Sequence, residues 1–155
     1  MYELVIRGGE VVDGSGLPSY RADIGIRGGR ISRIGRIKER GGEELDARGL
    51  VVAPGFIDGH THMDAQVAWD PLGTCSCWHG VTTAIMGNCG FTLAPCRPDE
   101  KHLVLRNLER AEDIPAEAMA AGIDWTWETY AQYLDALEGW RKGINYAGYV
   151  GHSAL

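Results

Sequence analysis

The sequence predicts an α/β protein in which a small all-β segment precedes a series of parallel strands and helices. Short β-type runs punctuated by glycines fill residues 1–53, whereas residues 54–155 alternate apolar strands with segments of helical character. Hydrophobic residues make up 45% of the 155 positions, which is enough for an ordinary globular core. We therefore predict a β-subdomain at 1–53 and a separate α/β domain at 54–155.

The β-subdomain is predicted from short apolar runs separated by glycines. The runs lie at residues 4–6, 11–12, 23–26 and 30–34, with glycine pairs at 8–9 and 28–29. Such punctuation is typical of tight turns between antiparallel strands. The clearest hairpin is expected at residues 27–30, because Gly28 and Gly29 accept the positive φ values of a two-residue turn.

The second domain is predicted from strands that alternate with helices. Strands are expected at residues 56–58, 81–86 and 146–150, and amphipathic helices at 98–113 and 127–140. This alternation favours parallel strands joined by helical crossovers. Thr126 is the expected N-cap of the second helix, and Gly139 or Gly143 its expected end.

Charge and composition exclude several classes of protein. The chain has 15 Lys and Arg against 21 Asp and Glu, a net charge of -6, and shows no basic stripe, so a nucleic-acid partner is not expected. Neither a signal peptide nor a bilayer-length apolar run is present, which predicts a cytoplasmic protein without a membrane partner. Four cysteines lie in one stretch, and free thiols or metal ligands are expected there instead of disulfides: Cys75, Cys77, Cys89 and Cys96.

Two histidines follow the first strand of the second domain. His60 and His62 are two positions apart, so on an extended chain their side chains point to the same side. Both can approach one cation with imidazole nitrogens, which bind zinc at about 2.0 to 2.1 Å. Strand-end histidines are often only hydrogen-bonded polar residues, so metal binding is a hypothesis that depends on the preceding run at 54–58.

The pattern Pro-Gly-Phe-Ile-Asp-x-His-x-His at residues 54–62, after a small N-terminal β-sandwich, resembles the amidohydrolase superfamily. Members of that superfamily place the histidine pair at the end of the first strand of a TIM-like (β/α)8 barrel, around one or two divalent metals. Residues 60–71 and 79–95, which include Gly87-Asn88-Cys89-Gly90, resemble the D-aminoacylase (N-acyl-D-amino-acid deacylase) branch. Its cysteine is a metal ligand, which implies the zinc ligands His60, His62 and Cys89.

The position of Cys89 agrees with this implication. Cys89 follows the strand at 81–86 at its C-terminal end, the face where barrel enzymes gather catalytic groups. A bound cation would hold a thiol of free pKa about 8.5 deprotonated, which makes it a strong zinc ligand. The competing interpretation is a buried structural cysteine, but Asn88 and two flanking glycines favour a close backbone approach instead.

Other candidates have two open roles or a structural one. Asp64 either orients a metal-bound histidine or caps the following turn. His152, after the third strand, either contacts substrate or an oxyanion, or is a structural hydrogen-bonding residue. Because no second pair completes a four-ligand site and His79 leads into the start of a strand, structural roles are predicted for Cys75, Cys77, His79 and Cys96.

The resemblance implies metal-dependent hydrolysis of a carbon–nitrogen amide bond, the deacylation of a small N-acyl-D-amino acid, with one or two Zn²⁺ ions as cofactor. A closed (β/α)8 barrel needs about 250 residues, so these 155 are expected to hold an incomplete barrel that stops after its third strand. The general-base aspartate is then expected beyond residue 155. The isolated chain is expected to be inactive and to self-associate through the open barrel edge near residues 146–150.

Two alternatives come from other functional classes. The first is a cyclic-amide hydrolase such as a dihydropyrimidinase or hydantoinase, and the second is a non-catalytic scaffold of the same fold, like the collapsin-response-mediator proteins. Cys89 favours the deacylase over the cyclic-amide hydrolases, which rely on a carboxylated lysine. The presence of His60, His62 and Cys89 together argues against the scaffold.

Overall fold

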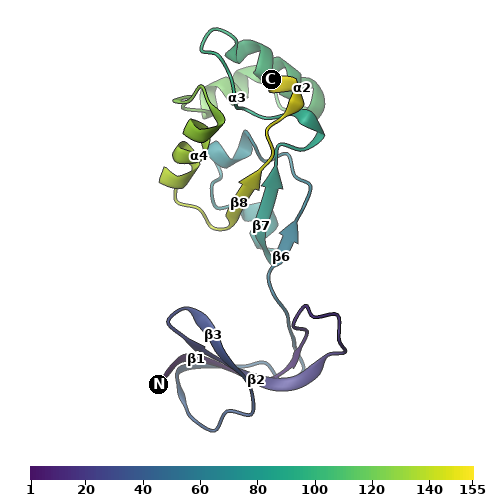
Figure 1. The fold of residues 1–155 in the computed structure, drawn as a ribbon, viewed down its shortest axis with the longest axis vertical. Coiled ribbons are helices and arrows are strands. Elements are labelled where there is room, and N and C mark those ends of the chain that lie inside the picture. Colours follow the sequence, from purple (N-terminus) through teal and green to yellow (C-terminus); the bar gives the residue numbers. More distant parts are fainter. The chain divides into compact units, whose positions relative to one another are not determined.

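The computed structural model describes residues 1–155, which form two compact units, Met1–Pro54 and Gly55–Leu155 (Figure 1). The first unit consists of β-strands, and the second combines a sheet with helices. The chain is therefore a mixed α/β protein. None of its helices is both long and apolar enough to cross a membrane.

A single five-stranded sheet forms the first unit. Its order is β3-β2-β1-β4, and β5 also pairs with β1. The β1–β2 and β2–β3 pairs are antiparallel, whereas β4 and β5 each lie parallel to β1. The strands are β1 (Tyr2–Val11), β2 (Tyr20–Arg27), β3 (Arg30–Gly35), β4 (Gly41–Asp46) and β5 (Val51–Val52).

The expectation of antiparallel strands is wrong for two pairs of this unit, because β4 and β5 each lie parallel to β1. These residues form one sheet, where a small β-sandwich was expected. Strand β4 was not predicted, because Glu43, Glu44 and Asp46 leave it without an apolar pattern. Its pairing with β1, Leu4 opposite Glu43, uses backbone groups and needs no apolar side chains. Charged side chains also suit a strand at the edge of a sheet.

Two glycine pairs of the first unit have different structural roles. The hairpin predicted at residues 27–30 is confirmed, with Gly28 and Gly29 at φ values of 60° and 67°. Gly8, by contrast, lies inside β1 at a φ of 65° and marks an irregularity in the β1–β2 register. The expected break at this position is therefore a β-bulge within one long strand.

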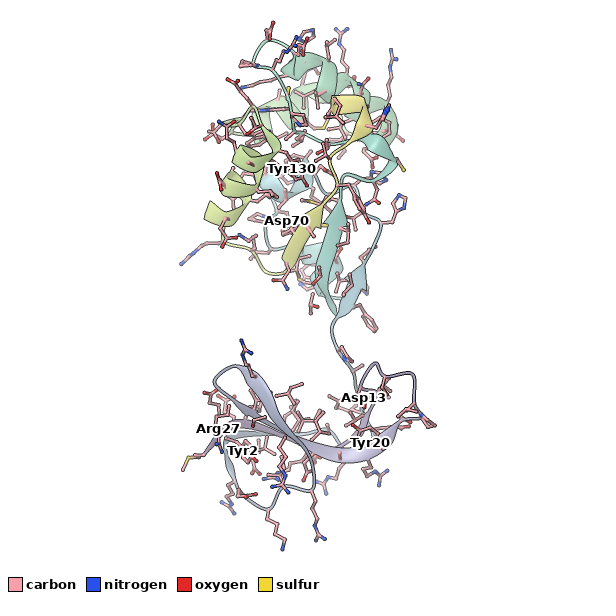
Figure 2. All side chains as sticks on the ribbon, in the orientation of Figure 1. Tyr2, Asp13, Tyr20, Arg27, Asp70 and Tyr130 are labelled. Atoms are coloured by element: carbon pink, nitrogen blue, oxygen red, sulfur yellow. The ribbon has the colours of Figure 1, made fainter.

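A small apolar cluster, Tyr2, Val5 and Ile37, forms the core of the first unit. The aromatic ring of Tyr2 packs where Gly25 has no side chain, since a Cβ atom there would overlap the ring. The Arg27 guanidinium carbon lies 5.1 Å from the centroid of the same ring (Figure 2). Tyr2 is thereby enclosed between the sheet and a cation.

The second unit contains three parallel strands in the order β6-β7-β8 (Figure 1). The strands predicted at 56–58 and 81–86 are confirmed, and the third covers 145–148. The elements are β6 (Phe56–Asp58), α1 (Thr74–Cys77), β7 (Val81–Met86), α2 (Lys101–Glu112), α3 (Ala116–Gly122), α4 (Tyr130–Gly139) and β8 (Asn145–Gly148), with 3-10 turns η1 (Gln66–Ala68), η2 (Asn88–Gly90) and η3 (His152–Ala154).

Trp127 anchors the core of the second unit, where it is 1% exposed. Its indole nitrogen donates a hydrogen bond of 3.0 Å to the Leu93 carbonyl, and its ring packs on Tyr133 at a centroid distance of 5.0 Å. The helix predicted at 127–140 is therefore wrong at its start. Trp127 matches the helical spacing, but it precedes α4 and is held by a partner 34 residues away in sequence.

Helix α4 begins with a capping box at Thr129, not at the expected Thr126. The Thr129 hydroxyl oxygen accepts a hydrogen bond from the Gln132 backbone N–H at 3.3 Å. In return, the Gln132 side-chain oxygen accepts one from the Thr129 backbone N–H at 2.9 Å. Two N–H groups that the helix leaves without partners are thus satisfied reciprocally.

Replacing Thr129 by alanine is expected to lower the free energy of unfolding of the second unit by about 1 kcal/mol, because the cap hydroxyl is lost. Thr126→Ala is the matched control and should change it by less than about 0.5 kcal/mol, since Thr126 is exposed. Urea unfolding followed by tryptophan fluorescence measures both variants. Equal losses for the two threonines would contradict the assigned cap.

Candidate metal centre

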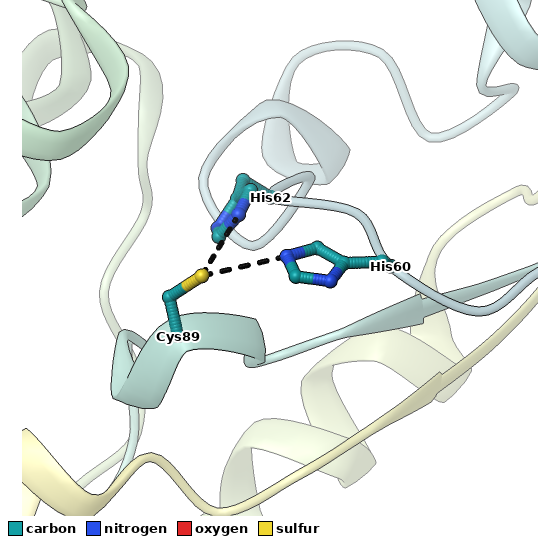
Figure 3. A group of neighbouring side chains, drawn as sticks. All are labelled: His60, His62 and Cys89. Carbon is teal, nitrogen blue, oxygen red and sulfur yellow. Dashed lines mark hydrogen bonds between the residues drawn. The ribbon is translucent and has the colours of Figure 1, made fainter.

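Three potential metal ligands meet at the ends of two neighbouring strands. His60 and His62 follow β6, and Cys89 lies in η2 directly after β7. Because β6 and β7 are parallel and paired, both segments leave the same edge of the sheet. The Nε2 atoms of the histidines and the Sγ atom of Cys89 point toward one another (Figure 3). One ligand atom from each residue lies within 4.8 Å of the other two.

The separations of these atoms fit a zinc ion. The Cys89 sulfur lies 3.4 Å from Nε2 of His60 and 3.7 Å from Nε2 of His62. A tetrahedral zinc with a Zn–S bond of about 2.3 Å and Zn–N bonds of about 2.0 to 2.1 Å sets S···N separations of about 3.6 Å. Two imidazoles and a thiol are also the donors that zinc prefers. The donor set and its spacing therefore suit this metal.

The residue between the two histidines holds them in place. Thr61 is buried, and both its backbone N–H and its hydroxyl donate to the Ile85 carbonyl of β7, at 3.0 and 2.9 Å. His60 and His62, on either side of Thr61, direct their Nε2 atoms toward Cys89 instead. Asn88 joins the two segments, because its side-chain amide donates to the carbonyls of Thr61 and Ile85.

Cys89 has an uncommon backbone conformation. Its φ is 55° and its ψ is 13°. This is the left-handed region of backbone conformation, which residues other than glycine, asparagine and aspartate rarely adopt. Gly87 and Gly90 on either side also have positive φ values, of 76° and 83°. A strained non-glycine residue in a tight loop is a recurrent feature of functional sites, where the fold maintains the strain.

Asp64 is 2% exposed and contacts the loop that contains Cys89. Its carboxylate accepts a hydrogen bond of 3.0 Å from the Gly87 backbone N–H, and the Tyr133 hydroxyl donates to its carbonyl at 3.1 Å. Burial raises the pKa of the Asp64 carboxyl to about 6. This hydrogen bond joins the segment after His62 to the start of the Cys89 loop.

A cavity of about 400 Å³ opens beside two of the three potential ligands. Its lining includes His62, Cys89, Phe91, Asn107, Arg110 and Glu112. The last of these is a residue that the sequence did not single out, and its carboxylate lies 3.2 Å from Nδ1 of His62. The only sequence signal for Glu112 is an acidic residue at the C-terminal end of a helix, where the helix dipole disfavours it.

The remaining predicted residues lie outside the group of three. His152 begins η3, is exposed, and packs near Gly90, next to Cys89. Cys75 is exposed and lines a second cavity, of about 420 Å³, together with His60 and His62. Cys75 therefore lies near the two histidines. His79 precedes β7, so it lies at the opposite end of that strand from Cys89. All four cysteines are free thiols in this structure.

Comparison with known proteins gives several matches. A family model described as the amidohydrolase family matches residues 43–155. D-aminoacylase from Alcaligenes xylosoxydans xylosoxydans is 40% identical over 99% of this chain and 30% of its own length. A solved structure of a D-aminoacylase with a binuclear metal center is 32% identical to this chain, with a TM-score of 0.78. The match covers 99% of this chain and 30% of the length of that protein.

A second solved structure adds a bound metal and inhibitor. It is N-acyl-D-glutamate deacylase from Bordetella bronchiseptica complexed with zinc and a phosphonate inhibitor that mimics the tetrahedral intermediate of the reaction. It is 32% identical with a TM-score of 0.71, over 99% of this chain and 30% of its own length. This chain thus spans about 30% of the length of the relatives that it matches.

Proposed function

The chain belongs to the amidohydrolase family, and on that basis we propose that it supplies zinc ligands to a hydrolase that cleaves the amide bond of N-acyl-D-amino acids. The observation that carries the proposal is the convergence of His60, His62 and Cys89, with sulfur–nitrogen separations suited to zinc. In this proposal residues 1–53 are the small β-subdomain of the family. Residues 54–155 are the first three strands of its (β/α)8 barrel, with their helices.

Each residue of the site has a distinct task in this proposal. His60 and His62 would each coordinate the cation through the lone pair of Nε2. The Cys89 thiolate would add a negative charge that offsets part of the charge of the divalent cation. Thr61 and Asn88 hold the two ligand-bearing segments together. The Thr61 hydroxyl donates to the Ile85 carbonyl of β7, and the Asn88 side-chain amide donates to the carbonyls of Thr61 and Ile85. A divalent cation held there supplies Lewis acidity and lowers the pKa of water toward about 7.

The substrate class is inferred from the relatives and from the cavity. The matched proteins are named D-aminoacylase and N-acyl-D-glutamate deacylase, both of which indicate amides of D-amino acids. An N-acyl amino acid keeps its free carboxylate, and the cavity beside His62 and Cys89 carries Arg110. A guanidinium is suited to bind a carboxylate in two-point fashion. Charge and position therefore support an anionic small-molecule substrate.

The histidine pair provides the direct test of the metal site. His60→Ala and His62→Ala are each expected to weaken zinc binding by more than about 100-fold, because each removes a metal ligand, and loss of an outer partner alone costs about 10- to 100-fold. His79→Ala is the matched control and should bind zinc like the unchanged chain. Chelator competition and metal analysis of the purified chains give the affinities. Zinc bound equally well without either histidine, or not bound at all, would refute the site.

The substrate proposal has its own test. A protein of the relatives' length that carries this segment is expected to release D-methionine from N-acetyl-D-methionine much faster than L-methionine from the L enantiomer. Removing zinc with a chelator should abolish the release, and adding zinc back should restore it. Hydrolysis that ignores chirality, or that survives complete removal of metal, would argue against this function.

A further inference from the structure

The two ring nitrogens of His62 face different partners. Nε2 lies 3.7 Å from the Cys89 sulfur, on the side of the proposed metal. Nδ1 lies 3.2 Å from a carboxylate oxygen of Glu112, the last residue of α2. Both side chains are largely buried, with 24% of the His62 side chain and 20% of the Glu112 side chain exposed. The imidazole is thus placed between a thiol and a carboxylate.

The Nδ1 atom of His62 needs a hydrogen-bond partner. It is shielded from solvent, and no aligned hydrogen bond reaches it. The Glu112 oxygen stands at a suitable distance, but it is not aligned with the ring nitrogen. A buried polar group without a partner is costly, so a small rotation of either side chain that completes this bond is favoured. The Glu112 carboxylate is the acceptor that the structure provides.

We propose that Glu112 is a positioning residue, which accepts the Nδ1–H of His62 and thereby directs the Nε2 lone pair toward Cys89 and the metal. The proposal rests on the proposed function, because it takes His62 to be a zinc ligand. A metal-binding histidine commonly donates its other ring N–H to a carboxylate, which fixes the tautomer and the ring orientation and raises the basicity of the ligand nitrogen. Glu112 holds the matching position here.

The local environment of Glu112 offers no other explanation for an acid at this position. The helix dipole disfavours negative charge at the C-terminal end of α2, and the only ion-pair contact of Glu112 is with His62. Helix α2 is fixed to the core by the buried side chains of Leu105 and Leu108. Its last residue is therefore held beside His62 by packing that does not depend on the metal.

Zinc affinity tests this role with three variants of the chain. Glu112→Ala removes the acceptor and is expected to weaken zinc binding by about 10- to 100-fold, as loss of such outer partners does. Glu112→Gln keeps an oxygen acceptor without the charge, so it should lose less than the alanine variant. Glu109→Gln is the matched control, because Glu109 lies one turn earlier on α2 and its carboxylate accepts from the Ala116 backbone N–H instead. Its affinity should equal that of the unchanged chain.

A second measurement reports on His62 without any metal. The ring ¹⁵N shifts of His62 in the zinc-free chain, at a pH where the imidazole is neutral, are expected to show the tautomer protonated at Nδ1. Glu112→Ala should shift the population toward protonation at Nε2, and Glu109→Gln should not.

The outcomes separate the two proposals. If the unchanged chain binds no zinc, the proposed function fails, while the tautomer measurement still decides the role of Glu112. If zinc binding requires His60, His62 and Cys89 but is equal in the unchanged chain and the Glu112→Ala variant, with an unchanged His62 tautomer, the positioning role is overturned and the proposed function stands.

Discussion

Replacing Cys89 by glycine is expected to remove tight zinc binding while stabilising the metal-free chain. Cys89 has a φ of 55°, a left-handed conformation that costs about 1–2 kcal/mol for a residue with a side chain. Glycine adopts it freely but loses about 0.5–1 kcal/mol more conformational entropy on folding. The Cys89 side chain is exposed, so little burial is lost. The free energy of unfolding should therefore rise, by up to about 1.5 kcal/mol.

The same substitution removes the only thiol among the three proposed ligands. Loss of a direct ligand should exceed the roughly 10- to 100-fold effect of losing an outer partner, so zinc affinity is expected to fall by more than about 100-fold. Cobalt provides an independent readout, because the charge-transfer absorption of a cobalt–thiolate bond should vanish with Cys89. Chelator competition and urea unfolding of the same samples measure both effects.

Two control variants separate the backbone effect from the ligand effect. Cys89→Ser keeps a side chain at the positive φ, so it should lose zinc affinity without gaining stability. Cys77→Ser should keep the zinc affinity, because the Cys77 thiol lies outside the ligand group and donates to the Thr74 carbonyl. A Cys89→Gly chain that retains its zinc would overturn the ligand assignment. One that is less stable than the unchanged chain would overturn the strain argument.

Replacing Gly87 by alanine is expected to destabilise the second unit by about 2–5 kcal/mol. The φ of Gly87 is 76°, which accounts for about 1–2 kcal/mol in a residue with a side chain. A Cβ atom at this position would also collide with the Tyr149 carbonyl oxygen, and overpacking of this kind typically costs about 1–3 kcal/mol. The Tyr149 backbone cannot retreat freely, because its N–H donates to the Met86 carbonyl.

The metal centre should weaken with the same change. Gly87 donates its backbone N–H to the Asp64 carboxylate and lies two residues before Cys89. If the added Cβ atom displaces Gly87, the loop that contains Cys89 moves with it. Zinc affinity in Gly87→Ala is therefore expected to fall even though all three ligands remain. Urea unfolding followed by tryptophan fluorescence is suited to the stability measurement, since all five tryptophans belong to the second unit.

Gly80→Ala is the control for backbone conformation alone. Gly80 has a φ of 82°, but a Cβ atom there would meet only the Phe56 ring, at 3.4 Å. Its expected cost is about 1–2 kcal/mol, from the positive φ without a backbone collision. If the two alanine variants were equally stable, contact with Tyr149 would not be the reason that position 87 requires glycine.

Several features could be predicted from the sequence because a short stretch of residues determines them. The apolar runs at 56–58 and 81–86 are strands with these bounds, and Gly28 and Gly29 form the predicted hairpin. The family resemblance implied that His60, His62 and Cys89 belong together, and they meet because β6 and β7 are parallel neighbours whose ends share one edge of the sheet. For the two strands and the hairpin, the pattern and its structural consequence lie within a few residues.

Other features were decided by contacts between distant residues. The charged strand β4 forms because its backbone pairs with β1, and Trp127 leaves the predicted helix because the Leu93 carbonyl holds its indole. Asp64 binds the backbone of Gly87, and Glu112 reaches a histidine 50 positions earlier in the chain. Periodicity reports which face of an element is apolar, but it contains no information about the partner across the fold. The tertiary structure therefore determines which carboxylate meets which N–H.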